Sequence, residues 1–144
     1  MFTPSREEAR RFFIEAWRKH RQGLPLQPLE ALAADLIARH PEYHATLETQ
    51  ASLQREWPPE LGESNPFLHL GLHLAVAEQL SIDQPPGLRP LYQELMRQLQ
   101  DQHRVEHAIM DCLAEHLWQT QHYGQPFDGP AYLQCIKARC TRVC

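Results

Sequence analysis

One segment near the middle of the chain constrains the fold more than any other. Residues 65–80 read NPFLHLGLHLAVAEQL, and in a helix their apolar side chains would cover nearly the whole circumference. Asn65 and Pro66 form a strong helix start, because asparagine caps free backbone amides and proline suits the first helical position. We expect the helix to run to about Ser81. A helix that is apolar on every side belongs in a protein interior.

The rest of the chain also predicts helices. Start signals and apolar stripes with three- and four-residue spacing mark segments at residues 6–21, 28–39, 88–122 and 129–142. A short helix is expected from Pro41, because proline pushes the residue before it away from helical geometry. The third segment is long for one helix, so we expect a bend near residues 100–102, with Asp101 capping its second half. The pattern therefore predicts an all-α protein.

Length and loop signals predict the domain organisation. The 144 residues suit one domain over 1–144, since a chain of this size can bury a real core. Residues 45–64 are expected to be partly loop, because the polar stretch from about Thr49 to Ser64 contains two prolines and a glycine; this loop could close over a site. Residues 140–144 are expected to fray, as chain ends commonly do.

Charge and hydropathy argue against two classes of partner. The formal net charge is −4 and the basic residues are mostly scattered, which argues against nucleic acid as the main partner. The N-terminal residues lack the apolar stretch of a secretory signal, and no apolar run approaches the ~18 residues that a membrane span needs. We therefore expect a cytoplasmic protein with no membrane partner.

The four cysteines are Cys112, Cys135, Cys140 and Cys144. Without an export signal, we expect reduced thiols and no disulfide framework. The terminal three contain no CxxC element and match structural zinc patterns poorly. Cys112 lies on an apolar helical face, which predicts a small core residue.

Six of the nine histidines form three pairs with four-residue spacing, and these are His40 with His44, His69 with His73, and His103 with His107. On a helix, four residues correspond to about 6 Å of rise and about 40° of rotation, so both imidazoles of a pair point the same way. His40 precedes Pro41, which makes the first pair the least regular. His69 and His73 are the most informative, because buried imidazoles need partners.

The third pair lies in the most ligand-dense stretch, where Glu106 shares a helical face with His103 and His107. Imidazole is the commonest protein metal ligand, so three pairs on three segments predict a metal site in which Glu106 is a bridging or outer carboxylate. Many histidines with few carboxylates fit iron, zinc or copper better than magnesium or calcium. The alternative is a metal-free network of hydrogen-bonded core histidines, and periodicity does not separate the two.

Three motifs together carry a family resemblance, and these are HPEYH at 40–44, NPFLHLGLHLAVAEQ at 65–79 and DQHRVEHAIMDCLAEHLWQTQ at 101–121. From about Arg11 to Tyr132 the chain resembles the small bacterial proteins grouped as domain of unknown function 1841. This resemblance implies an all-helical protein and supplies no activity. In architecture alone, the chain also resembles haemerythrin-like bundles, in which side chains from several helices point inward at a pair of metal ions.

The leading interpretation is a metal-binding protein, a compact helical bundle of about five to six helices with an internal histidine-rich site. Dinuclear iron is the first choice of metal, and mononuclear zinc or iron the second. Iron with open positions would suit dioxygen or redox chemistry, whereas zinc would suit hydrolysis. Glycine-rich phosphate loops and the GxSxG and HExxH motifs are absent from the sequence, so other enzyme classes find little support. Whether the protein is an enzyme is left open.

The second interpretation is a metal-free protein-interaction module. The first predicted helix carries Phe12, Phe13 and Trp17 beside several basic residues, and such a face could dock onto a partner protein. The same face could instead pack inside the bundle, which we prefer.

Overall fold

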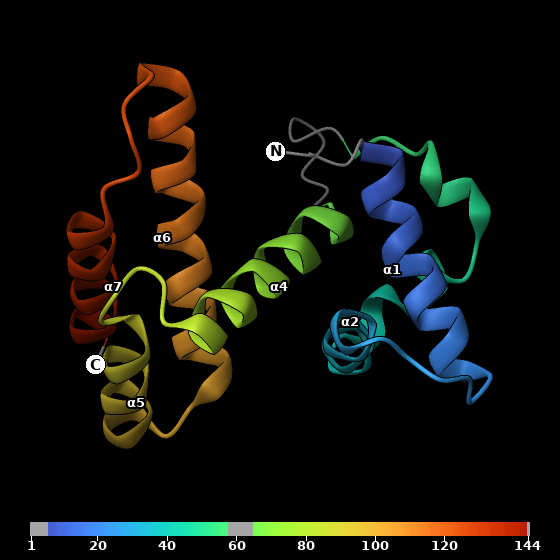
Figure 1. The fold of residues 1–144 in the computed structure, drawn as a ribbon, viewed down its shortest axis with the longest axis horizontal. Coiled ribbons are helices and arrows are strands. Elements are labelled where there is room, and N and C mark those ends of the chain that lie inside the picture. The colour runs from blue at the N-terminus through green and yellow to red at the C-terminus, as the bar shows by residue number, and fades with distance from the viewer. Residues whose placement is uncertain (1–5, 58–64, 144) are drawn as a thin grey trace. The chain divides into compact units, whose positions relative to one another are not determined.

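The computed structural model describes residues 6–57 and 65–143. Within these residues the chain forms seven α-helices and two short 3-10 helices, and no strand (Figure 1). This confirms the all-α prediction, with a helix count slightly above the expected five to six.

In chain order the elements are α1 (Arg6–Arg21), α2 (Pro28–Ala38), η1 (Pro41–Tyr43), α3 (His44–Leu47), η2 (Gln50–Leu53), α4 (Pro66–Ile82), α5 (Leu88–Leu99), α6 (Gln102–Tyr123) and α7 (Gly129–Val143). The predicted helix starts are confirmed at two places. The Asn65 side chain accepts hydrogen bonds from the backbone amides of Phe67 (2.9 Å) and Leu68 (3.3 Å) at the start of α4. The Asp101 side chain accepts from the Arg104 amide (3.1 Å), so the long segment divides there into α5 and α6.

Two segments differ from the sequence-based expectation. The predicted loop contains η2, whose first turn is capped by the Thr49 hydroxyl accepting from the Ala51 amide (3.3 Å). Residues 58–64 of this loop, which as a whole was expected to close over a site, lie outside the described residues. The tail expected to fray from residue 140 is helical as far as Val143, and Cys140 is buried.

The apolar helix α4 is largely but not wholly enclosed. Leu70, Leu74 and Val76 are buried, whereas Leu68 and Ile82 are 62% and 65% exposed. The expectation that α4 is buried on every side is therefore too strong. Backbone contacts divide the chain inside this helix, into a first unit of residues 1–74 and a second unit of residues 75–144. A single domain over the whole chain stays a prediction.

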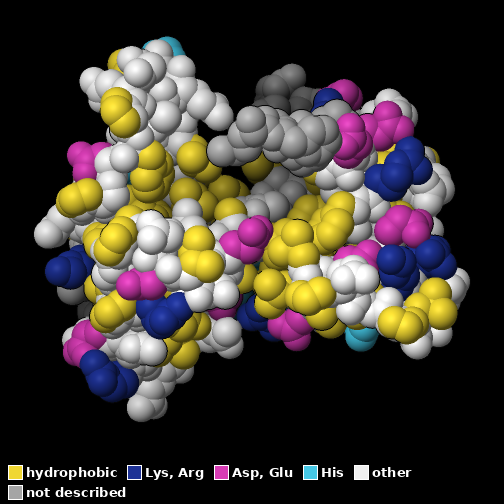
Figure 2. Space-filling model, in the orientation of Figure 1, with side chains coloured by type: hydrophobic (Ala, Val, Ile, Leu, Met, Phe, Trp, Pro, Cys, Tyr) yellow, Lys and Arg dark blue, Asp and Glu magenta, His cyan; other side chains and the backbone are white. Residues whose placement is uncertain are grey.

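In the first unit, α1 packs against α2 around a core that includes Phe13, Trp17, Leu36 and Ile37. Phe13 and Trp17 are only 4% and 6% exposed, so these two side chains pack inside the protein, whereas Phe12 is half-buried. Docking of this helix onto a partner protein stays a prediction. Around the core, charged and hydrophobic side chains are interspersed on the visible surface (Figure 2).

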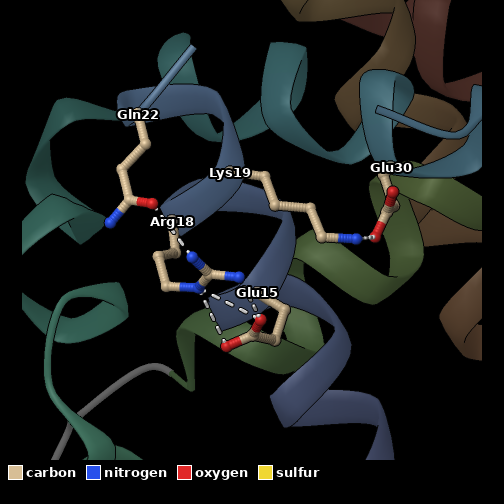
Figure 3. Close-up of polar contacts among 5 residues, drawn as sticks. All are labelled: Glu15, Arg18, Lys19, Gln22 and Glu30. Atoms are coloured by element: carbon tan, nitrogen blue, oxygen red, sulfur yellow. Dashed lines mark hydrogen bonds and ion pairs between the residues drawn. The ribbon is translucent and has the colours of Figure 1, made fainter. Parts of the chain in front are cut away.

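Polar contacts fix the outer side of the α1–α2 pair. The Lys19 ammonium lies 2.8 Å from a carboxylate oxygen of Glu30 and so ties α1 to the first turn of α2 (Figure 3). Along α1 itself, the Arg18 guanidinium bonds to Glu15 and to Gln22. The Glu30 carboxylate also accepts from the Gln27 backbone amide (2.9 Å), which completes a capping box at the start of α2.

The second unit contains α5, α6 and α7 and has its own buried side chains. Tyr132 is fully buried, and its hydroxyl donates to the Gln79 side chain (2.7 Å). Cys112 and Cys135 form a disulfide between α6 and α7. The expectation of reduced thiols is therefore wrong for this pair. The two helices pack together and bring the Cα atoms to 6.0 Å, a proximity that a separation of 23 residues does not reveal.

Across the described residues, no helix combines the length and the apolar character needed to cross a membrane. The cytoplasmic location stays a prediction.

Candidate metal centre

Three histidines surround one point in the first unit. One ring nitrogen from each of His40, His69 and His73 lies within 4.8 Å of those of the other two. The ring centroids are 5.0 Å apart for His40 and His69, 4.9 Å for His40 and His73, and 5.1 Å for His69 and His73. The ring planes are inclined to one another by 66° to 72°, so none of the three pairs is stacked.

Local structure explains how these rings meet. His69 and His73 lie one turn apart on α4 and therefore share a face, as their spacing predicts. His40 follows the end of α2, where Pro41 disfavours helical geometry in the residue before it, and its backbone is at φ −126° and ψ 72°. This break directs the imidazole of His40 toward α4 instead of along its own helix.

A backbone hydrogen bond orients His40. Its Nδ1 lies 2.7 Å from the Leu36 carbonyl oxygen in the last turn of α2, which also accepts from the Arg39 backbone amide (3.2 Å). Since a carbonyl only accepts, Nδ1 carries the proton, and a neutral ring then has its lone pair on Nε2. Metal-bound histidines are typically held in this way, with the other ring nitrogen donating to a carbonyl or carboxylate.

The other ring nitrogen of His40 faces a second histidine. Its Nε2 lies 3.3 Å from Nε2 of His69. In a tetrahedral site with metal–nitrogen distances of about 2.0–2.1 Å, ligand nitrogens lie about 3.3–3.4 Å apart and ring centroids about 5 Å apart. The observed distances fit that geometry. They also fit a hydrogen bond in which Nε2 of His69 donates to His40.

Tyr43 forms one wall of the cluster. Its ring stacks on His40 with centroids 5.5 Å apart and meets His69 edge-on at 5.7 Å. Burial, with a smaller effect from the nearby Glu42 carboxylate, raises the pKa of Tyr43, so the phenol stays neutral near pH 7. His40 and His73 are buried, with 6% and 3% exposure, and His69 is half-buried. Well-packed, poorly hydrated imidazoles are preorganised to bind a cation with little side-chain movement.

His44 lies outside this cluster. Its Nε2 donates to the Ile37 carbonyl (2.9 Å), and its ring packs on Trp17 with centroids 4.5 Å apart. The first pair therefore diverges, because Pro41 prevents residues 40–44 from forming one continuous α-helix.

The remaining predicted residues lie on α6 in the second unit. The ring centroids of His103 and His107 are 3.8 Å apart, and Nδ1 of His107 donates to the His103 carbonyl (2.7 Å). His103 is exposed and His107 is half-buried, whereas Glu106, which lies between them in the sequence, is buried. The participation of these three residues in metal binding stays a prediction from the sequence.

Sequence reasoning missed two features of the cluster. One is the Leu36 carbonyl that orients His40, and the other is the stacking of Tyr43 on that ring. The four-residue step from Leu36 to His40 at a helix end was an available signal for the first. The stacking of Tyr43 follows from the 3-10 turn after Pro41, which periodicity does not predict.

Comparisons with known proteins add a family but no activity. Neither the curated proteins nor the solved structures gave a match to this chain. A family model described as a domain of unknown function (DUF1841) matches residues 5–138, a range that includes every histidine discussed above. The chain therefore belongs to the DUF1841 family.

Proposed function

We propose that this protein binds a transition-metal ion through His40, His69 and His73. The observation that carries the proposal is the fit of the three rings to a tripod, with the His40 and His69 nitrogens 3.3 Å apart and His40 held by the Leu36 carbonyl. Neutral imidazole donors suit iron, zinc and copper and suit magnesium and calcium poorly. The family assignment is consistent with this proposal but does not test it.

The choice between a reactive and a structural site depends on whether a fourth protein ligand, for which His107 is a sequence-based candidate, joins these three. Structural zinc sites use four protein ligands, whereas catalytic sites with three protein ligands leave a position for water or substrate. A zinc ion here would supply an activated water for hydrolysis, and an iron ion would supply a position for dioxygen or a related small ligand. A mononuclear centre needs only these three histidines and a solvent or substrate ligand. Dinuclear iron requires further ligands, for which His103, Glu106 and His107 are the sequence-based candidates.

Metal content is the direct test. The full chain, purified without a histidine tag or chelator, should contain about one equivalent of iron or zinc by elemental mass spectrometry. Two irons per chain, with a visible absorption spectrum, would instead support the dinuclear form. If no metal binds stoichiometrically, even after anaerobic addition of iron, zinc or copper, the proposal is wrong.

His44 provides a matched control for His40. The two residues are four positions apart, but only His40 belongs to the cluster. We expect His40→Ala to abolish stoichiometric metal binding, while His44→Ala retains it, with circular dichroism used to show that both variants are folded. Equal metal content in the two variants would contradict the assigned ligands. His107→Ala and Glu106→Gln, measured in the same way, test the predicted contribution of α6.

A metal-free histidine network is the second candidate function of the cluster, in a structural or interaction protein. It is favoured by the hydrogen bond from Nδ1 to the carbonyl four residues earlier, which also occurs at His107 and His116 and so is not specific to the cluster. In this case Nε2 of His69 carries a proton and donates to His40. Nitrogen NMR of the imidazoles separates the two candidates. If the histidines form a metal-free network, added metal leaves the tautomer of His69 unchanged.

A further inference from the structure

The disulfide between Cys112 and Cys135 is a second chemically reactive group, separate from the histidine cluster. It joins α6 to α7 across 23 residues, and both helices belong to the second unit. Cys112 is fully buried, whereas Cys135 is half-buried. The third cysteine that the structure describes, Cys140, is 2% exposed and is not part of the disulfide. The two residues of the disulfide therefore differ in their access to solvent.

This difference decides where a small thiol can attack. In thiol–disulfide exchange a thiolate attacks one sulfur and expels the other, so the rate depends on access to the attacked sulfur. Cys135 is the accessible side of this disulfide, and Cys112 is then the leaving sulfur on the buried side. Redox-sensing cysteines typically combine an accessible thiol with a neighbouring resolving thiol, which is the arrangement here. In the cytoplasm, the location that the sequence predicts, disulfides are usually transient, catalytic or redox-sensing.

Other contacts hold the two helices together without the disulfide. Tyr132 and Ile136 of α7 are fully buried, and α6 packs against α7. The Arg139 guanidinium on α7 lies 3.3 Å from a carboxylate oxygen of Glu115 on α6. We therefore expect reduction to leave the helices in place, so that the two thiols stay close and the disulfide can form again. Groups held in position react far faster than the same groups in free solution.

We propose that Cys112 and Cys135 form a reversible disulfide that exchanges with small thiols, with Cys135 as the attacked sulfur and Cys112 as the resolving sulfur. A small thiolate attacks Sγ of Cys135, a mixed disulfide forms there, and Cys112 leaves as a thiolate that takes up a proton. A second small thiolate attacks the small-thiol sulfur of the mixed disulfide, which releases the Cys135 thiol and a small disulfide. Two small thiols are thus oxidised as the protein disulfide is reduced, and a small disulfide reverses both steps.

Charges beside Cys135 affect which thiols react. An oxygen of the Glu115 carboxylate lies 4.0 Å from Sγ of Cys135, and its ion pair with Arg139 offsets part of its charge. The Asp111 carboxylate lies 3.9 Å from the same guanidinium, so two carboxylates and one guanidinium give this group a net charge of −1. This charge repels anionic thiols such as glutathione and favours cationic thiols such as cysteamine.

Tryptic mapping of the full chain tests the cysteine pair directly. Trypsin cleaves after Arg104 and Lys137, so the peptide of residues 105–137 contains both cysteines and excludes Cys140 and Cys144. After treatment of the folded protein with glutathione disulfide, this peptide should contain an internal disulfide and resist alkylation. After dithiothreitol both of its cysteines should be alkylated, while circular dichroism shows that the helices remain. If glutathione disulfide leaves both cysteines open to alkylation, or if dithiothreitol reduces only the urea-unfolded chain, the proposal is overturned.

Two matched variants identify the attacked sulfur. With glutathione disulfide, Cys112→Ala should form a mixed disulfide at Cys135, because the accessible thiolate attacks the reagent and the resolving thiol is missing. Cys135→Ala should leave the buried Cys112 unmodified. Where circular dichroism shows that a variant is unfolded, limited alkylation of the reduced wild-type chain gives the same information, and Cys135 should carry the first label. A mixed disulfide or a first label on Cys112 would overturn the assignment.

Glu115→Gln tests the effect of charge on the same step. At low ionic strength, the rate of reduction by glutathione divided by the rate with cysteamine should rise by roughly twofold to fivefold. A unit charge about 4 Å from the reacting atom acts with this strength in water. Comparing the two reagents on one variant removes any general effect of the substitution on the fold. A ratio that stays unchanged would mean that attack occurs away from Cys135 and would overturn the proposal.

Discussion

Replacing Arg10 by methionine should destabilise the first unit far more than the same change at its neighbour Arg11. Arg10 is only 3% exposed, and its Nη1 donates to the carbonyls of Ser52 (3.1 Å), Leu53 (3.2 Å) and Arg55 (2.8 Å). Its guanidinium also lies 5.1 Å from the ring centroids of Trp57 and Phe67. The side chain thus ties α1 to the segment after η2 and to the first turn of α4.

The size of the effect follows from these contacts. One nitrogen has two N–H groups, so the three carbonyls share about two full bonds, each worth about 1.5–3 kcal/mol from a charged donor. The two aromatic faces add about 1 kcal/mol each. Burial of the cation opposes this gain, because it costs free energy and lowers the pKa of Arg10. The uncharged methionine side chain does not carry this cost. We expect a net loss of about 3 kcal/mol, mostly because the carbonyls lose their donor.

Arg11 is the matched control. Its guanidinium pairs with Glu7 at 2.8 Å on the exposed side of α1, an interaction worth about 0.3–0.5 kcal/mol. Urea unfolding followed by tryptophan fluorescence gives the free energies of unfolding of Arg10→Met and Arg11→Met. If these differ by less than about 0.5 kcal/mol, which is the usual range of surface substitutions, the assigned role of Arg10 is wrong.

Two further predictions concern stability in each unit. Tyr132→Phe should cost about 1 kcal/mol of unfolding free energy, because the buried hydroxyl that donates to Gln79 is lost. Tyr123 is 62% exposed, so Tyr123→Phe should cost almost nothing. Equal losses of unfolding free energy for the two variants in urea would refute this account. In the first unit, the Lys19 ammonium, followed by the Gln27 amide, lowers the pKa of Glu30, so its ionised form stabilises the fold. The stability advantage of the wild type over Glu30→Gln should be complete well above pH about 4.3, the unfolded pKa of glutamate, and should disappear as the pH falls through the lower folded pKa. An advantage of the same size at pH 7 and pH 2 would show that the ion pair is not its source.

The helices could be predicted because their signals are local. Asn65 with Pro66, and Asp101 after the left-handed Gln100, act on backbone groups within three or four residues, so the starts of α4 and α6 can be read directly from the sequence. The four-residue spacing of His69 and His73 likewise fixes a shared face as soon as α4 forms. The sequence by itself therefore determined the all-α class, most helix boundaries and two of the three clustered histidines.

Only the tertiary structure decided which groups meet across long separations. Periodicity pairs His40 with His44, yet the break at Pro41 turns His40 toward His69, 29 residues away, and leaves His44 on Trp17. The same limit applies to the disulfide between Cys112 and Cys135 and to Arg10, whose carbonyl partners lie 42 to 45 residues away. Helical spacing specifies the direction of a side chain relative to its own axis, whereas the partner on another helix depends on how the helices pack. That packing is set by the whole buried surface and is not encoded in any single motif.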